Sequence, residues 1–471
     1  MPQETILIAG GGITGLSAAW NILKRAKAAG RSPQIILVEK EKRLGGKTQT
    51  QVVDGMIVEE GPDSVIAYKP WAVQLAKELG LETVGTNPNI RTTYIMHNGR
   101  LESLPVGMQI MIPTEVWPFL KTRLLSPWGK LRAGLEPFMP IRKTDEDESI
   151  GSFVGRRFGQ EVLENVAGPL MGGIYGGDFG AVSMKATFPR FLQMEREGGS
   201  LLLQGWRNKE NKPKGPTGSA FVTVKGGLNR LVNELISRME GQVRFLTGVS
   251  LTGLVRGPEG KGYVAGLDNG ERIEAEAVVL ALPAYVAASL VKEYLPEVAS
   301  ELNAIPYHNS VVAAMAFHRK EVDHPLNASG FLVPAREPTV VTACTWVSSK
   351  WPHATPEDKV LIRCFIGRGN EAKDWTREPD EVIIGHARKE LEQIMGLKAE
   401  PFFTRVFKWP RAMPQYRVGH LDRMDRVERL MQQTPGLYVA GAAFRGVGLP
   451  DCVREGSQAA EKAAKHLGWE A

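Results

Sequence analysis

Cysteine is scarce in this sequence, with only Cys344, Cys364 and Cys452 among 471 residues. Their odd number and long spacings give neither a disulfide framework nor a zinc-finger pattern. The eight histidines also lack metal-ligand spacing, so we expect no metal site. This use of cysteine is typical of a reducing compartment, and we expect a cytoplasmic protein.

Long apolar runs are missing as well. The uncharged stretch 278–291 is shorter than the roughly 18 residues that indicate a membrane-spanning helix, and Pro283 interrupts it. The apolar start of the chain, 5–23, has no basic segment before it and contains three consecutive glycines. We therefore expect neither a transmembrane helix nor a signal peptide.

Charge of one sign is never concentrated in a block. The net charge is +6, from 58 Lys and Arg against 52 Asp and Glu. Without a basic tail, the sequence gives no indication of nucleic-acid binding. The small positive excess leaves two interpretations open: an ordinary solvated surface, or a field that attracts an anionic substrate or an anionic membrane surface.

The first motif that is present is Ile6-Leu-Ile-Ala-Gly10-Gly-Gly12-Ile-Thr-Gly15. Its four apolar residues predict a buried parallel strand, and the apolar spacing in 16–29 predicts a helix. Gly10 allows a tight turn, Gly12 leaves room for a pyrophosphate, and Gly15 lets the helix pack closely on the strand. The free N–H groups at the start of the helix favour phosphate binding, so the motif predicts a dinucleotide site.

A second strand, 34–39, supports this interpretation. It ends in Glu39, which is 24 residues beyond the last glycine of the motif and so is placed to reach the adenosine ribose hydroxyls. The run Arg43-Leu-Gly45-Gly46-Lys47-Thr48 adds a second glycine pair, with Lys47 or Arg43 able to offset pyrophosphate charge. NAD enzymes do not usually have this second pair, so it favours FAD.

Later segments fit the same cofactor. The run Glu60-Gly61-Pro62-Asp63-Ser64 predicts a constrained turn suited to the ring end of a flavin. The run from Leu437 to Pro450 predicts a strand and a glycine-rich loop before the last helix, whose N-terminus would favour the anion of reduced flavin. The other expected elements are strands at 310–317, 360–366 and 437–440, a turn at 268–270, helices at 380–395 and 456–467, a turn opening into a helix at 222–237, an exposed connection at 208–218, and a mostly helical segment over 91–210.

These runs together resemble the superfamily of amine oxidases, phytoene desaturases and protoporphyrinogen oxidases. The resemblance narrows to the porphyrinogen oxidases, and most closely to the Gram-positive type that acts on coproporphyrinogen III. It extends over nearly the whole chain, and the runs that narrow it are Pro169–Asp178, Ala186–Pro189, Ala343–Trp346, Trp409–His420 and Gly446–Asp451.

The resemblance implies an α/β (α+β) fold in three parts. A discontinuous Rossmann-like FAD-binding domain would take 1–66, 219–296 and 405–471. A substrate domain would take 67–90, 210–218 and 297–404, and a helical insertion would take 91–209.

The resemblance also implies contacts at matching positions. In the substrate cavity these are Lys69, Ile174 and Phe365. After Gly441 the chain has two alanines where many relatives carry an acid, so a side-chain contact to the flavin is in doubt there, although backbone contacts remain open. The positions that match FAD contacts are Gly10, Gly11, Gly12, Ile13, Thr14, Gly15, Glu39, Lys40, Lys47, Gly61, Pro62, Asp63, Ser64, Val249, Trp409, Val447, Gly448 and Leu449.

The implied reaction is a six-electron oxidation of coproporphyrinogen III to coproporphyrin III in haem biosynthesis, with O2 as acceptor and H2O2 as product. The sequence has no HExxH or GxSxG motif and no nucleophile–base pair, so we assign no catalytic residue. Protoporphyrinogen as substrate, an amine oxidase or carotenoid desaturase, an NAD dehydrogenase, and a porphyrin carrier with structural FAD remain alternatives. The implied partners are an anionic porphyrinogen, O2 and, transiently, a downstream haem-pathway enzyme.

The segment 116–130 mixes aromatic and basic residues. Two interpretations stay open: an amphipathic helix packed on the substrate domain, or a weak peripheral contact with a membrane surface.

Overall fold

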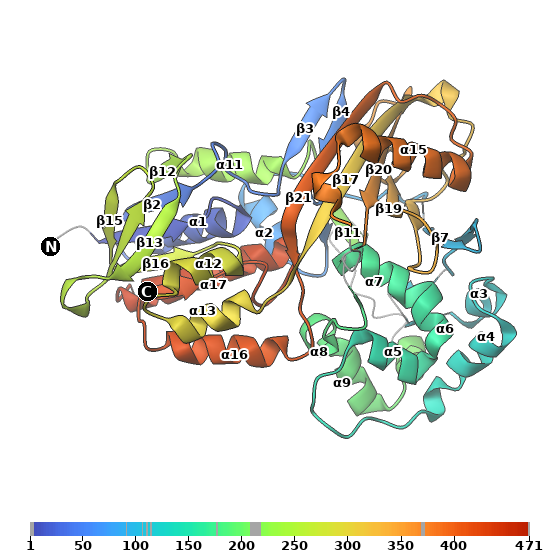
Figure 1. The fold of residues 1–471 in the computed structure, drawn as a ribbon, viewed down its shortest axis with the longest axis horizontal. Coiled ribbons are helices and arrows are strands. Elements are labelled where there is room, and N and C mark those ends of the chain that lie inside the picture. Colours follow the sequence, from blue (N-terminus) through green and yellow to red (C-terminus); the bar gives the residue numbers. More distant parts are fainter. Residues whose placement is uncertain are drawn as a thin grey trace.

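A computed structural model describes residues 4–90, 92–105, 107–109, 112–113, 115–175, 178–207, 218–368 and 373–469. Figure 1 shows three adjoining parts, with one sheet and its helices at the left, a second sheet at the upper right and a group of helices at the lower right. Both chain ends lie on the left part. The chain therefore leaves the first sheet and returns to it at the end.

The first sheet is parallel and buried on both faces. On β1, Ile6 and Ile8 pack toward one core, while Leu7 and Ala9 pack toward the other. This double burial explains why the strand is a continuous apolar run. The strand order is β12 (Val243–Thr247), β2 (Gln34–Glu39), β1 (Thr5–Ala9), β16 (Ala277–Leu280) and β22 (Leu437–Val439).

Two different layers cover this sheet. Four helices share the first core: α1 (Ile13–Ala28), α2 (Trp71–Glu78), α11 (Asn229–Met239) and α17 (Leu449–His466). The second core joins the antiparallel strands β13 (Leu251–Arg256), β14 (Tyr263–Leu267) and β15 (Arg272–Ala275) to helices α12 (Ala284–Val291), α13 (Pro296–Asn303) and α16 (His420–Met431). Helices α1 and α17 pack closely at Gly456, which has no side chain. A Cβ at this position would lie 2.3 Å from the carbonyl oxygen of Thr14.

The second sheet has seven strands, in the order β21 (Phe403–Pro414), β17 (Tyr307–His318), β20 (Lys359–Ile366), β19 (Val341–Trp346), β18 (Gly330–Leu332), β7 (Tyr94–His97) and β8 (Arg100–Ser103). Helix α15 (Asp380–Met395) packs on one face. The hairpin of β3 (Thr50–Val53) and β4 (Met56–Glu59) packs on the other face, through Met56 and Val58. This hairpin connects the two sheets next to the turn at 60–64.

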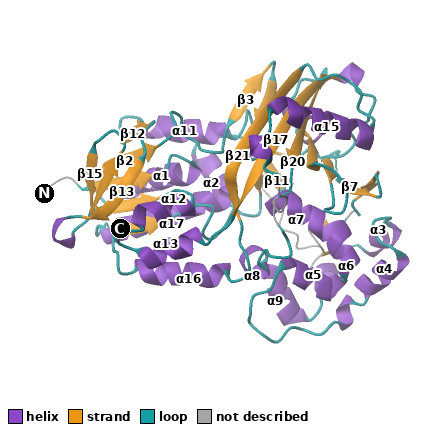
Figure 2. Cartoon of the chain, in the orientation of Figure 1, coloured by secondary structure: helices purple, strands orange, loops and turns teal. Residues whose placement is uncertain are grey.

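The third part is mainly helical (Figure 2). Helix α7 ends beside the second sheet, since a Cβ on Gly173 would lie 3.0 Å from the side chain of Leu332. None of the helices in the described parts of the chain combines the length and apolarity needed to cross a membrane. The helices are α3 (Val116–Lys121), α4 (Pro127–Gly134), α5 (Ile150–Phe158), α6 (Gln160–Val162), a π-helical turn (Leu163–Ala167), α7 (Gly168–Tyr175), α8 (Met184–Thr187), α9 (Pro189–Gly198) and α10 (Leu201–Arg207).

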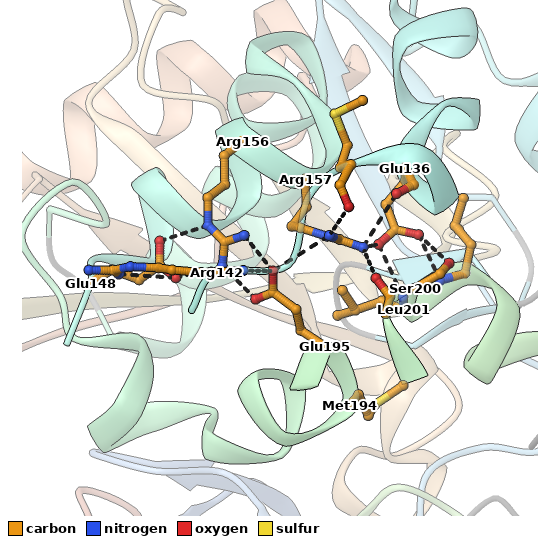
Figure 3. Close-up of polar contacts among 12 residues, drawn as sticks. Glu136, Arg142, Glu148, Arg156, Arg157, Met194, Glu195, Ser200 and Leu201 are labelled. Atoms are coloured by element: carbon orange, nitrogen blue, oxygen red, sulfur yellow. Dashed lines mark hydrogen bonds and ion pairs between the residues drawn. The ribbon is translucent and has the colours of Figure 1, made fainter. Parts of the chain in front are cut away.

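A buried ion network holds this helical part together (Figure 3). Arg157 and Glu136 are fully buried and paired with each other. Glu136 also accepts hydrogen bonds from the hydroxyl of Ser200, at 2.6 Å, and from the N–H of Leu201, at 3.1 Å. Glu136 thus caps the first turn of α10 with a charge that Arg157 compensates.

The same network extends to α9. Arg156 bonds Glu148 at 2.7 Å and Glu195 at 2.5 Å. Burial disfavours the ionised form of Glu148, but the hydrogen bonds and charge of Arg156, together with Ser152 and Arg142, hold its pKa below the ordinary value. Helices α5, α9 and α10 are therefore fixed by charges as well as by apolar packing.

The structure confirms several expected elements. Helix α15 has the predicted bounds, β2 has the predicted bounds, and the turn after Leu267 closes a hairpin. The last helix begins at Leu449 rather than 456, because Pro450 fits the first turn of a helix, where its missing N–H costs nothing.

The expectation of a mostly helical segment from residue 91 was wrong at its start. Strands β7 and β8 form a hairpin and extend the seven-stranded sheet. The turn is Asn98-Gly99, with φ values of 51° and 75°, and Asn-Gly is a strong hairpin signal that the sequence carried. A strand, β11 (Phe221–Val224), likewise precedes the turn and helix expected at 222–237.

Helix α2 lies in the expected substrate domain (67–90) but packs into the core of the first sheet. We therefore propose a division in which α2 belongs with the first sheet and 94–103 belongs with the second.

Candidate functional site

The glycine turn between β1 and α1 has the geometry that its sequence predicts. The N–H of Gly10 donates to the carbonyl of Val38 at 2.8 Å, and Gly10 has a φ of 104°. A Cβ on Gly15 would lie 1.9 Å from the carbonyl oxygen of Gly10, so only glycine allows this close packing of helix on strand. Ile13 and Thr14 are buried in the first turn of α1.

Gly12 differs from the other glycines of this turn. It precedes α1 in an extended conformation, and a Cβ built on it would have no atom within 4 Å. The backbone therefore borders open space at the N-terminus of α1, where free N–H groups and the helix dipole favour an anion.

Glu39 lies beside this turn. Its carboxylate accepts the N–H of Gly11 at 2.6 Å and the N–H of Glu41 at 2.9 Å. Its carbonyl accepts the N–H of Val249 at 3.1 Å, so the chain brings Val249 next to Glu39. Lys40 is exposed and lies 3.6 Å from Glu41.

The second glycine pair packs against the first. The N–H of Gly45 donates to the carbonyl of Gly11 at 2.8 Å. Lys47 is accessible to solvent, yet the surrounding protein lowers its pKa by desolvation. An anion bound beside this side chain would favour its charged state.

The turn at 60–64 is held from behind by the second sheet. The indole N–H of Trp409 donates to the carbonyl of Glu60 at 3.0 Å, and Arg363 donates to the carbonyl of Gly61 at 2.6 Å. Lys350 bonds the carboxylate of Asp63 at 2.9 Å. Ser64 donates its hydroxyl to the same Asp63 at 2.7 Å, and Pro62 is exposed.

Charges stabilise this turn. Burial disfavours the ionised form of Asp63, but Lys350 and Arg363 outweigh it and hold its pKa below the ordinary value. Burial raises the pKa of the neighbouring Glu59 to about 7. The turn is fixed by a paired carboxylate. Its backbone packs against the loop that carries the second glycine pair, since a Cβ on Gly61 would lie 2.2 Å from the carbonyl oxygen of Lys47.

The last glycine-rich loop, 441–448, completes the group of turns. Gly441 lies near α1, since a Cβ on it would lie 3.8 Å from the hydroxyl of Thr14. Gly448 precedes α17, Leu449 is buried in its first turn, and Val447 is half-buried before it. Thr14 also interacts with Cys452, so the first turns of α1 and α17 are adjacent.

These residues fit an FAD molecule. Open space at Gly12, the carboxylate of Glu39, the desolvated Lys47 and the adjacent N-termini of two helices provide for a pyrophosphate and a ribose. The turn at 60–64 and the loop 441–448 would take the ring system. We therefore propose that the residues predicted to contact FAD bind it in this arrangement.

The predicted substrate residues lie on different elements. The ammonium of Lys69 pairs with Asp451 of α17 at 2.6 Å. Phe365 is half-buried on β20, on the same face as Arg363, whose guanidinium lies 5.6 Å from its ring centroid. Ile174 lies near the end of α7, and its side chain is outside the described residues. We propose that all three line a cavity for the substrate.

Sequence reasoning missed the residues that support these turns. Arg363 and Lys350 contact the turn at 60–64 from about 290 to 300 positions away, and Asp451 contacts Lys69 across the chain. Of these three residues, only Asp451 lies in a run that narrows the family resemblance, Gly446–Asp451. Among the described residues, no cluster of three His, Cys, Asp or Glu side chains could hold a metal ion.

Comparisons with known proteins agree with this geometry. Residues 13–464 match the family of flavin containing amine oxidoreductases. The chain is 37% identical to the coproporphyrinogen III oxidase of Bacillus subtilis (strain 168), over 99% of both chains, and 34% identical to that of Staphylococcus aureus (strain NCTC 8325 / PS 47), over 98% of this chain and 100% of the relative. The fold is also similar to the crystal structure of a protein from Exiguobacterium sp. 255-15 that is named as a protoporphyrinogen oxidase. The TM-score is 0.87 and the identity is 32%, over 99% of this chain and 100% of that protein.

Proposed function

The chain belongs to the flavin-containing amine oxidoreductases, and from that premise we propose that it oxidises coproporphyrinogen III to coproporphyrin III. The reaction removes six electrons and, with three O2 as acceptors, yields three H2O2. The observation that carries the proposal is the full-length similarity to coproporphyrinogen III oxidases, together with a flavin-type arrangement of glycine turns. The free thiols of the three cysteines support a cytoplasmic location.

The protein's part in this reaction is positioning. When bound, FAD supplies two-electron oxidation of the macrocycle. Lys69 would bind a propionate of the substrate, and Phe365 would pack on the apolar ring. The backbone N–H groups of 447–449 would favour negative charge at the flavin ring. We assign no residue as a general base.

The substrate preference is tested by comparing kcat/KM for coproporphyrinogen III and protoporphyrinogen IX. We expect the higher value for coproporphyrinogen, which carries four propionates instead of two. A much faster oxidation of protoporphyrinogen would overturn the assignment. A yellow protein that binds porphyrin but turns over neither substrate would favour a carrier with structural FAD.

Replacing Lys69 by methionine is expected to raise KM for coproporphyrinogen III about 10-fold or more, with a smaller change in kcat. The reason is the loss of a hydrogen bond between charged groups, worth about 1.5–3 kcal/mol. Asp451 keeps a cationic partner, because Arg454 stays 3.5 Å away. Steady-state kinetics on Lys69→Met give the answer, with Lys225→Met as control because Lys225 pairs with Glu82 on the surface. An unchanged KM would remove Lys69 from the substrate site.

We also propose a peripheral membrane contact through the helical part. Trp117, Trp128 and Phe138 are 73%, 78% and 79% exposed, and Arg123, between Trp117 and Trp128 in the sequence, is exposed as well. Aromatic rings flanked by basic groups suit an anionic lipid surface. The neighbouring exposed residues are Leu120, Leu131, Leu135, Ile141 and Lys121.

The membrane contact predicts that the protein floats with anionic vesicles at low salt. Replacing both Trp117 and Trp128 by serine is expected to abolish flotation, because it removes most of the aromatic surface. Replacing Phe402, which is 38% exposed and lies just before β21 of the second sheet, serves as the control. Absence of flotation in the unmodified protein at low salt would exclude the contact.

A further inference from the structure

The segment 415–420 leads from β21 into the first residue of α16 and contains a stacked ring pair. The rings of Tyr416 and His420 are 3.9 Å apart and inclined by 11°. Both side chains are buried, with 3% and 4% of their surface exposed. Burial lowers the pKa of His420 to about 4, so its imidazole is neutral at pH 7.

Both side chains point their polar atoms at the loop 441–448. The hydroxyl of Tyr416 donates to the carbonyl of Ala442 and accepts the N–H of Gly446, each at 2.7 Å. Nε2 of His420 lies 2.8 Å from the carbonyl oxygen of Phe444, which can only accept, so the neutral ring donates from Nε2. One hydroxyl therefore closes the loop across four residues, and the imidazole fixes its middle.

The loop has no polar side chain of its own over 441–444, where the sequence is Gly-Ala-Ala-Phe. Gly441 and Gly446 have φ values of 136° and 156°, which makes their conformations unusual for other residues. A loop of small residues has many accessible conformations, so external hydrogen bonds must select one of them. Tyr416 and His420 supply such bonds.

The segment is also tied to the helical part. The N–H of Ser183 donates to the carbonyl of Tyr416 at 2.7 Å, and the N–H of Val418 donates to the carbonyl of Ala181 at 3.0 Å. Asp147 accepts the N–H of Gly419 at 3.0 Å and the hydroxyl of Ser183 at 2.6 Å. The position of Tyr416 is thus set by the helical part, while its hydroxyl sets the loop.

We propose that Tyr416 is a positioning residue for the flavin: its hydroxyl holds the loop 441–448 so that the N–H groups leading into α17 face the flavin ring. This role rests on the flavin site and not on the identity of the substrate. Correctly aimed N–H groups and the positive end of the helix dipole stabilise the anion of reduced flavin. A displaced loop stabilises that anion less and makes the flavin harder to reduce.

The test is Tyr416→Phe, which keeps the ring stack and removes both hydrogen bonds. We expect the variant to bind FAD, with its two-electron midpoint potential shifted to a lower value. A tenfold loss in the equilibrium constant for reduction corresponds to about 30 mV and is the expected order of magnitude. The potential is measured by dye-coupled titration of the FAD-loaded protein.

A matched control is Tyr263→Phe. Tyr263 is 1% exposed, and its hydroxyl donates to the carbonyl of Pro435 at 3.0 Å, before β22 instead of after it. Both replacements are expected to lower the thermal unfolding midpoint, but only Tyr416→Phe shifts the potential. His420→Phe, which keeps a stacked ring and removes the bond to Phe444, is expected to shift the potential in the same direction.

A wild-type potential in Tyr416→Phe would overturn the role of Tyr416, as would an equal shift in Tyr263→Phe. A wild-type protein that binds no FAD would instead remove the flavin site on which the role rests. If Tyr416→Phe does not fold, His420→Phe decides by the same potential.

Discussion

Replacing Gly12 by valine is expected to give a folded protein that no longer binds FAD. The valine has room in the cofactor-free protein, because a Cβ at this position meets no atom within 4 Å, and the backbone φ of −70° suits any residue. The same side chain would occupy the space that we assign to the pyrophosphate. We expect FAD affinity to fall at least 100-fold, with the unfolding midpoint of the apoprotein nearly unchanged.

Two other glycines sharpen this prediction. Gly15→Val is expected to damage the fold itself, since its Cβ would lie 1.9 Å from the carbonyl oxygen of Gly10. Gly385→Val, in α15, also adds a side chain in open space but far along the chain from the turns, and is expected to leave FAD binding intact. Fluorescence titration with FAD and thermal unfolding of each apoprotein separate the three outcomes. Wild-type FAD affinity in Gly12→Val would show that the pyrophosphate lies elsewhere.

The second large effect is on stability. Replacing Glu136 by alanine is expected to lower the free energy of unfolding of the helical part by about 3–5 kcal/mol, because the buried Arg157 loses its paired carboxylate and keeps Glu195 at the longer distance of 3.5 Å. The N–H groups of Leu201 and Leu202 also lose their acceptor at the start of α10. Urea unfolding measures the loss.

A double variant distinguishes the buried charge from lost packing. Glu136→Leu combined with Arg157→Met is expected to be much closer to the wild type than either single replacement, since no charge remains unpaired. As a surface comparison, Glu234→Ala breaks an exposed pair with Arg238 and is expected to cost only about 0.3–0.5 kcal/mol. A cost below about 1 kcal/mol for Glu136→Ala would contradict the network as a source of stability.

Local sequence patterns predicted the parts of the site that are local in the chain. The turn from Gly10 to Gly15 and the carboxylate of Glu39 follow from a strand–turn–helix pattern whose geometry is set by a few consecutive residues. Helix α15 followed from apolar spacing alone. The hairpin β7–β8 was not predicted, although Asn98-Gly99 is a hairpin turn signal. The whole segment 91–210 was predicted to be mostly helical because most of it is.

Contacts between distant segments could not be predicted from the sequence. No spacing rule relates Glu136 to Arg157, or Lys69 to Asp451, because each pair depends on how separate elements pack. The same holds for Tyr416, which lies in the run Trp409–His420. The hydrogen-bond partners of its hydroxyl become visible only when the segment 415–420 and the loop 441–448 are placed together. The motif thus identified candidate site residues, but the contacts of these residues required the structure.

The most direct test of the proposed activity is the stoichiometry of coproporphyrinogen III oxidation in air by the FAD-loaded protein. Porphyrin is followed by its fluorescence and H2O2 by a peroxidase-coupled assay, with Gly12→Val protein as the blank for spontaneous oxidation. We predict enzyme-dependent porphyrin formation with three H2O2 for each porphyrin. A yellow protein that produces no porphyrin above the blank would contradict the proposed activity.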